Sequence, residues 1–125
     1  MAMSPSNCVM IVNDNTDLVN LFQDALEHQG IETCASTNPN LALSNINANP
    51  NQFSLVLINY ASQSVGSDRK FAREVKAIRK NIKVILTSGY DLSAIDISKD
   101  GYDKFLHLPV KLSTLVSTVK ETLDS

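Results

Sequence analysis

Short, uninterrupted apolar runs alternate along this chain with stretches in which apolar residues recur at helical spacing. Three of the runs, residues 9–12, 55–58 and 84–86, are rich in β-branched side chains. Strands that are apolar at consecutive positions are typical of a parallel sheet that helices cover on both faces. The pattern therefore predicts an α/β fold.

Two less apolar segments, residues 31–36 and 104–108, are predicted to be edge strands. Five strands then alternate with five helical segments. Parallel strands joined by helices require right-handed crossovers, which place helices on both faces of the sheet. We therefore predict a doubly wound, five-stranded parallel sheet with five helices.

Local signals predict where the helices begin and end. The first helix is expected to end at Gly30, since glycine tolerates the left-handed conformation of a helix C-terminus. The second is expected to begin at Asn38-Pro39, an N-cap followed by proline. A short fourth helix is predicted within residues 91–99. The stripes expected to face the core from the first, third and fifth helices are Leu18, Leu21, Phe22, Ala25 and Leu26; Phe71, Val75 and Ile78; and Leu112, Leu115, Val116, Val119 and Leu123.

Composition limits the class of protein. The chain has 125 residues, 43% of them apolar, and is assigned to a single domain with a core over about residues 8–123. Its 11 basic and 13 acidic side chains give a net charge of −2 without a basic cluster, which argues against nucleic-acid binding. No apolar run approaches the roughly 20 residues that span a membrane, and the first residues do not resemble an export signal. We therefore expect a cytoplasmic protein.

In open parallel sheets, ligands bind outside the carboxyl ends of the strands. The residues expected at those ends are Asn13-Asp14, Asn59, Thr87-Ser88 and Leu108-Pro109. The candidate functional site is therefore predicted among them.

These strand ends resemble the receiver domain of two-component response regulators, a chemotaxis-regulator (CheY-like) fold, along most of the chain. Residues 9–15 resemble the family's first strand and acidic pair, and residues 55–60 its third strand and phosphoaccepting aspartate. Residues 84–90 resemble the fourth strand with its switch hydroxyl, and residues 105–110 the fifth strand with its Lys-Pro pair. The resemblance implies the strand order 2-1-3-4-5.

The resemblance also implies a role for each position. It places Asn13 and Asp14 at the acidic pair, Asn59 at the phosphoacceptor, Ser88 and Phe105 at the switch positions, and Leu108 and Pro109 at the Lys-Pro pair, with a cis peptide bond before Pro109.

The substitutions at these positions remove the chemistry of the family. An amide cannot replace the carboxylate nucleophile, so no acyl phosphate forms at Asn59. Magnesium prefers charged oxygen ligands, and Asp14 is the one carboxylate left, a weak ligand at most. With Asn13 and Asn59 neutral, a buried lysine at position 108 would have few partners, and Leu108 removes that cost. We therefore expect no cofactor and no aspartyl phosphorylation.

The function predicted is that of a pseudo-receiver, a protein-interaction module without enzymatic activity. Its partner is expected on the face of the fourth helix, fifth strand and fifth helix, which would carry Lys99, Tyr102, Lys104, Phe105, Lys111 and Lys120. One alternative is a working receiver phosphorylated elsewhere, for example on Asp14, Ser62 or Ser64. Another is a flavodoxin-like binder of flavin or nucleotide, although the acidic, glycine-free loop of residues 13–17 is a poor phosphate cradle.

Several of these residues also have simple structural roles. Asp14 is expected to be the N-cap of the helix that begins at Thr16, and Asn59 to cap the turn that follows it. His28 is expected at a helix end, and His107 is given no site role. The two cysteines, Cys8 and Cys34, make neither a disulfide framework nor a zinc site and are predicted to be small buried hydrophobes.

Overall fold

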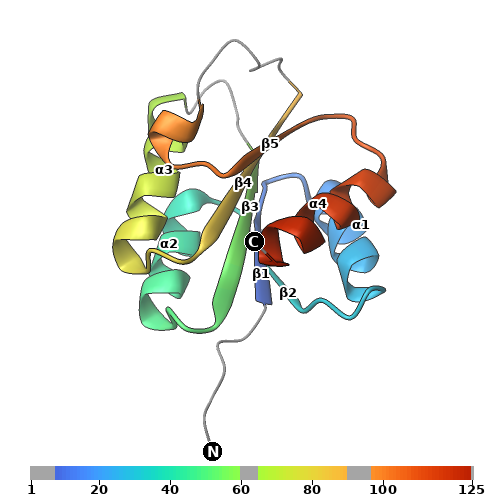
Figure 1. Ribbon diagram of the computed structural model, residues 1–125, viewed down its shortest axis with the longest axis horizontal. Helices are drawn as coiled ribbons and strands as arrows, with labels where there is room; N and C mark the ends of the chain where they lie inside the picture. Colours follow the sequence, from blue (N-terminus) through green and yellow to red (C-terminus); the bar gives the residue numbers. More distant parts are fainter. Residues whose placement is uncertain (1–7, 60–64, 90–96, 125) are drawn as a thin grey trace, which may run out of the picture.

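A five-stranded parallel sheet in the order β2-β1-β3-β4-β5 forms the centre of the molecule (Figure 1). The computed structural model describes residues 8–59, 65–89 and 97–124. Every pair of neighbouring strands is parallel, which confirms the predicted fold class and strand order. The strands are β1 (Cys8–Val12), β2 (Thr33–Ser36), β3 (Phe53–Asn59), β4 (Lys83–Ser88) and β5 (Lys104–His107).

Helices cover both faces of the sheet. The helices α1 (Thr16–Glu27) and α4 (Leu112–Asp124) lie on one face, and α2 (Pro39–Ala48) and α3 (Val65–Ile78) lie on the other (Figure 1). The described ranges hold four α-helices, not the predicted five, together with the 3₁₀ turn η2 (Ile97–Asp100). This turn takes the end of the helix predicted over residues 91–99, the rest of which lies outside the described residues. No helix in the described ranges is long and apolar enough to cross a membrane.

The strands β1 and β3 are buried on both faces, as the residues of β1 illustrate. Val9 and Ile11 of β1 contact the cluster under α1 and α4, whereas Met10 and Val12 contact the cluster under α2 and α3. All five residues of β1 are at most 3% exposed. Both sets of side chains must therefore be apolar, which explains the uninterrupted runs in the sequence.

Capping residues set the helix ends where the sequence predicts them. The side chain of Asn38 accepts a hydrogen bond of 2.9 Å from the backbone N–H of Leu41, and Pro39 follows at the first helical position. After α1, Gly30 adopts a φ of +78°, and the next backbone N–H returns to the carbonyl of Leu26 at 3.1 Å.

The buried face of α1 differs from the predicted one. Val19, Phe22 and Leu26 are buried, whereas Leu21 is 47% exposed. Phe22 and Leu26 confirm part of the predicted stripe, whereas Val19, which the prediction left out, is buried in place of Leu21. Leu112 of α4, also predicted to face the core, is 36% exposed.

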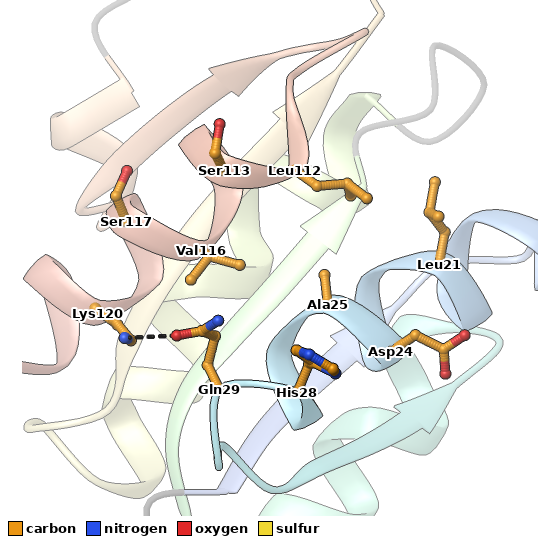
Figure 2. Close-up of a pocket in the computed structure, with 10 residues that line it drawn as sticks. All are labelled: Leu21, Asp24, Ala25, His28, Gln29, Leu112, Ser113, Val116, Ser117 and Lys120. Carbon is orange, nitrogen blue, oxygen red and sulfur yellow. Dashed lines mark hydrogen bonds between the residues drawn. The ribbon is translucent and has the colours of Figure 1, made fainter.

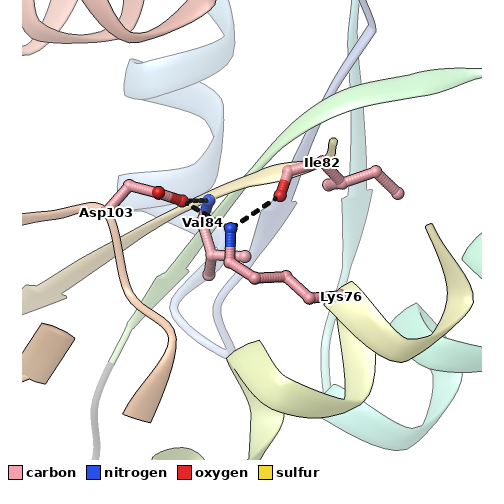
Figure 3. Close-up of polar contacts among 4 residues, drawn as sticks. All are labelled: Lys76, Ile82, Val84 and Asp103. Carbon is pink, nitrogen blue, oxygen red and sulfur yellow. Dashed lines mark hydrogen bonds and ion pairs between the residues drawn. The ribbon is translucent and has the colours of Figure 1, made fainter. Parts of the chain in front are cut away.

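A charged pair closes the junction between α3 and the edge of the sheet. The carboxylate of Asp103, the residue before β5, accepts hydrogen bonds from the backbone N–H of Val84 at 2.8 Å and from Nζ of Lys76 at 2.9 Å (Figure 3). Lys76 also donates to the carbonyl of Ile82 at 3.1 Å. The pair thus satisfies backbone groups at the beginning of β4.

We predict that Asp103→Ala lowers the free energy of unfolding by about 1–3 kcal/mol, because the part-buried N–H of Val84 loses its acceptor. Asp103→Asn keeps an acceptor oxygen and should cost less than about 1 kcal/mol through the weakened contact with Lys76. Urea unfolding followed by circular dichroism measures both. Equal losses for the two variants would show that the charge, not the backbone hydrogen bond, is what matters.

Candidate functional site

The carboxyl ends of the central strands bring the predicted site residues together. Asn59 at the end of β3 is paired in register with Thr87 of β4, and Val12, the residue before Asn13, is paired with Ile58. The predicted positions thus meet at one edge of the sheet, as the ends of neighbouring parallel strands should.

The side chain beside Asn59 is that of Thr87. The Thr87 hydroxyl lies 3.3 Å from Oδ1 of Asn59 and 3.3 Å from the carbonyl oxygen of Ile58, and it donates toward both. Thr87 is 1% exposed. The sequence analysis placed Thr87 among the strand-end residues but did not predict its hydrogen bond to Asn59.

The predicted switch residue, Ser88, lies next to Thr87 at the end of β4. Side chains alternate between the two faces of a strand, and Ile85 and Leu86 belong to opposite core clusters. Thr87 shares its face with Ile85, whereas the fully buried Ser88 shares its face with Leu86. The hydroxyl that contacts Asn59 is thus that of Thr87, and the pairing register of β3 and β4 sets this contact. The assignment of Ser88 to the switch position stays a prediction.

The loop after β1 begins with two capping asparagines. Oδ1 of the buried Asn13 accepts the backbone N–H of Asn15 at 2.9 Å, and Oδ1 of Asn15 accepts the backbone N–H of Leu18 at 3.1 Å. Asn15 is therefore the N-cap of α1, and the prediction that Asp14 fills this position is wrong. Asp14 is exposed.

These contacts leave a poor set of ligands for a divalent cation. The amide oxygens of Asn13 and Asn59 already accept hydrogen bonds within the protein. Among the strand-end residues predicted to form the site, Asp14 is the one carboxylate. Nowhere in those residues do three or more His, Cys, Asp or Glu side chains form a possible metal site. Magnesium prefers charged oxygens in octahedral geometry, and the residues present do not fit it.

The segment after β5 completes the edge. The backbone N–H of Leu108 donates to the carbonyl of Ser88 at 2.7 Å, and the peptide bond between Leu108 and Pro109 is cis, as the resemblance implies. The side chain of Leu108 packs against the cluster under α1 and α4. An aliphatic side chain therefore lies at the position for which the resemblance implies a lysine.

Two aromatic rings border this segment. The rings of Phe105 and His107 stack with their centroids 6.3 Å apart, and Nε2 of His107 lies 3.2 Å from the carbonyl oxygen of Gly89. His28 lies at the end of α1, as predicted, and is its C-cap, two residues before the expected Gly30. The predicted turn after Asn59 and the alternative phosphorylation sites Ser62 and Ser64 lie outside the described residues.

The predicted partner face is only partly assembled. Lys104 and Lys111 are exposed and Phe105 is half-buried, but Tyr102 is 4% exposed and packs in the core under α2 and α3. Tyr102 is therefore not a surface anchor. Lys120 faces α1, where its Nζ donates to the side chain of Gln29 at 3.0 Å.

A groove lies between α1 and α4 (Figure 2). The exposed Leu21 and Leu112 lie toward one end, the Lys120–Gln29 hydrogen bond lies at the other, and Ala25 contributes to the lining. Its volume is about 570 Å³. Sequence analysis missed it because both leucines were assigned to the core.

Solved structures of receiver domains share this fold. A receiver domain protein (CheY-like) from Methanospirillum hungatei is 24% identical with a TM-score of 0.80, over 95% of this chain and 94% of that one. A response regulator from Thermotoga maritima is 22% identical with a TM-score of 0.84, and the match covers 96% of this chain and 99% of that one. Another regulator from that organism, TrrA in complex with Mg²⁺-BeF, is 22% identical with a TM-score of 0.80, and the match covers 93% of this chain and 98% of that one. No family model and no curated protein matches the sequence. At these identities the likeness shows the receiver fold.

We predict that Leu108→Lys lowers the free energy of unfolding by about 1–3 kcal/mol, because the ammonium group would be partly desolvated without an anion beside it. In the background of Asn13→Asp and Asn59→Asp the same substitution should cost less, with a favourable coupling of about 0.5–3 kcal/mol. Denaturant unfolding of the four chains in this cycle measures the coupling, and Leu108→Met is the control for shape. A coupling free energy of zero would show that the cost of a lysine at position 108 does not depend on carboxylates at positions 13 and 59.

Proposed function

We propose that this chain is a pseudo-receiver, a domain with the receiver fold that binds a protein partner without accepting a phosphoryl group. The observation that carries the proposal is the amide of Asn59 at the end of β3, with its Oδ1 engaged by the hydroxyl of Thr87. The proposal includes membership of the response regulator family and a signalling role without enzymatic activity.

The chemistry of the nucleophile supports this proposal. An acyl phosphate forms when a carboxylate oxygen attacks phosphorus, with a cation and hydrogen-bond donors stabilising the transferred group. The amide oxygen of Asn59 carries no full charge, and the nitrogen lone pair is delocalised into the carbonyl. The side chain is therefore a hydrogen-bond acceptor for Thr87 and not a phosphoryl acceptor.

The electrostatics of the neighbouring positions support it as well. A lysine near a phosphoryl group acts as a point charge that pairs with anions. Asn13 and Asn59 supply no anion, and Leu108 supplies no cation, so the three substitutions agree with one another. If the phosphoaccepting aspartate alone had been replaced, the family's lysine would still be expected at position 108, without an anion to pair with.

Without a phosphoryl group, the proposed domain keeps one dominant conformation. Moving a two-state protein from 1:99 to 99:1 requires about 5.5 kcal/mol of differential binding, and neutral side chains offer no such contact to a phosphodonor. We place the partner on the surface around β5, where Lys104 and Lys111 are exposed beside the half-buried Phe105. These residues would offer positive charge around an aromatic edge to an acidic protein surface.

The test is incubation with Mg²⁺ and acetyl phosphate, followed by the mass of the intact protein. We expect no phosphoryl adduct, and no change in the backbone amide signals around Asn59 when Mg²⁺ and beryllium fluoride are added. The Thermotoga maritima regulator TrrA, solved in complex with Mg²⁺-BeF, is the positive control for the reagents.

A restored variant provides the matched comparison. Asn13→Asp, Asn59→Asp and Leu108→Lys together return two carboxylates and the cation, and this chain should gain Mg²⁺-dependent amide shifts that the native chain lacks. A stoichiometric phosphoryl adduct on the native chain would contradict the proposal. If fragmentation then placed the adduct on Asp14, Ser62 or Ser64, the relocated-site alternative would replace it.

A further inference from the structure

The two cysteines, 26 positions apart in the sequence, lie side by side in the folded chain. The thiol of Cys8 donates a hydrogen bond to the sulfur of Cys34, and the two Sγ atoms are 3.5 Å apart. Cys8 begins β1, and Cys34 lies on the neighbouring edge strand β2, where it is paired with Met10. Both side chains contact the cluster under α2 and α3, so they share one face of the sheet.

The two thiols differ in accessibility. Cys8 is 1% exposed, whereas Cys34 is only partly buried. An opening of about 420 Å³ reaches both. The acidic side chains Glu27 and Glu32 are among the residues that line it. Because Cys8 is the first residue of β1 and Asn13 follows the last, this opening lies at the other end of the strand from the candidate site.

We propose that Cys8 and Cys34 are a redox site, in which hydrogen peroxide or a similar small neutral peroxide converts the two thiols into a reversible intramolecular disulfide. The site is independent of the proposed pseudo-receiver function, since it uses neither Asn59 nor a partner. The sulfurs need to approach by about 1.5 Å to reach the bonding distance of about 2.05 Å.

The order of the two steps follows from burial. The Cys34 thiolate attacks one oxygen of the peroxide, forming an S–O bond and breaking the O–O bond, and the hydroxide released takes up the proton lost from Cys34. The sulfur of Cys8 then attacks the resulting sulfenic acid, forming the S–S bond and breaking the S–O bond. Hydroxide leaves with the Cys8 proton as water. Two thiols are oxidised to one disulfide, and one peroxide is reduced to two waters.

Cys34 is the thiol that reacts first because Cys8 holds its proton. Burial, the hydrogen bond to Cys34 and the nearby charges of Glu32 and Glu27 raise the pKa of Cys8 from 9.0 to about 12. The thiolate is the nucleophile in these reactions, so a buried protonated thiol waits for the sulfenic acid. The same two glutamates repel anionic oxidants such as glutathione disulfide, which favours an uncharged peroxide.

We test the proposal on the full native chain, reduced and then titrated with hydrogen peroxide. Both thiols should disappear together, the intact mass should fall by that of two hydrogen atoms, and peptide mapping should recover a Cys8–Cys34 linkage that dithiothreitol reverses. Unchanged thiols under peroxide that oxidises free cysteine would overturn the proposal. A sulfinic acid on Cys34 without linkage, or disulfides between chains, would overturn it too.

Two matched variants separate the roles of the thiols. Cys8→Ala should stop at a sulfenic acid on Cys34 that a dione reagent traps, whereas Cys34→Ala should leave the buried Cys8 unreactive. If either variant fails to fold, the order of reaction is tested on the native chain. Iodoacetamide should modify Cys34 quickly and Cys8 only on unfolding. Equal reactivity of the two native thiols would contradict the assigned order.

Discussion

Burial of β1 and β3 on both faces is the constraint on which the rest of the structure depends. Since Val9 and Met10 point into opposite core clusters, the strand cannot shift by one residue without exchanging the two faces. The register of β3 against β4 is fixed in the same way, and it places Thr87 beside Asn59. The hydrogen bonds at the candidate site therefore follow from packing in the core.

The polar side chains at the ends of β1 and β3 include two neutral amides, those of Asn13 and Asn59. A cluster of carboxylates would repel one another unless a cation lay among them. Amides remove that requirement, because each amide oxygen accepts an N–H or O–H from the protein itself, as Asn13 does from Asn15 and Asn59 from Thr87. With neutral side chains at Asn13 and Asn59, a lysine at position 108 would bring a desolvation cost without a partner, whereas Leu108 adds to the apolar core.

Sequence reasoning predicted most of the fold because its signals were local. Strands that are buried on both faces appear in the sequence as apolar runs. Asn38 and Gly30 indicate helix ends through their own conformational preferences. The errors concern positions that tertiary packing chooses between near equals. Leu21 was expected in the buried stripe of α1, where Val19 is buried instead, and the contact of Thr87 with Asn59 depends on the register of β3 and β4. The approach of Cys8 to Cys34 depends on the pairing of β1 with β2, which neither segment reveals alone.

The two ends of β1 differ in the kind of change they could transmit. At the carboxyl end, Asn13 is neutral, and its side-chain oxygen already accepts a hydrogen bond from the backbone of Asn15. At the amino end, a bond between Cys8 and Cys34 would join a central strand to the edge strand, whose residues are less buried. Edge strands are held by one neighbour only, and their local stability responds most to an added link. The disulfide that we propose between Cys8 and Cys34 would therefore act first on β2 and the helix that follows it.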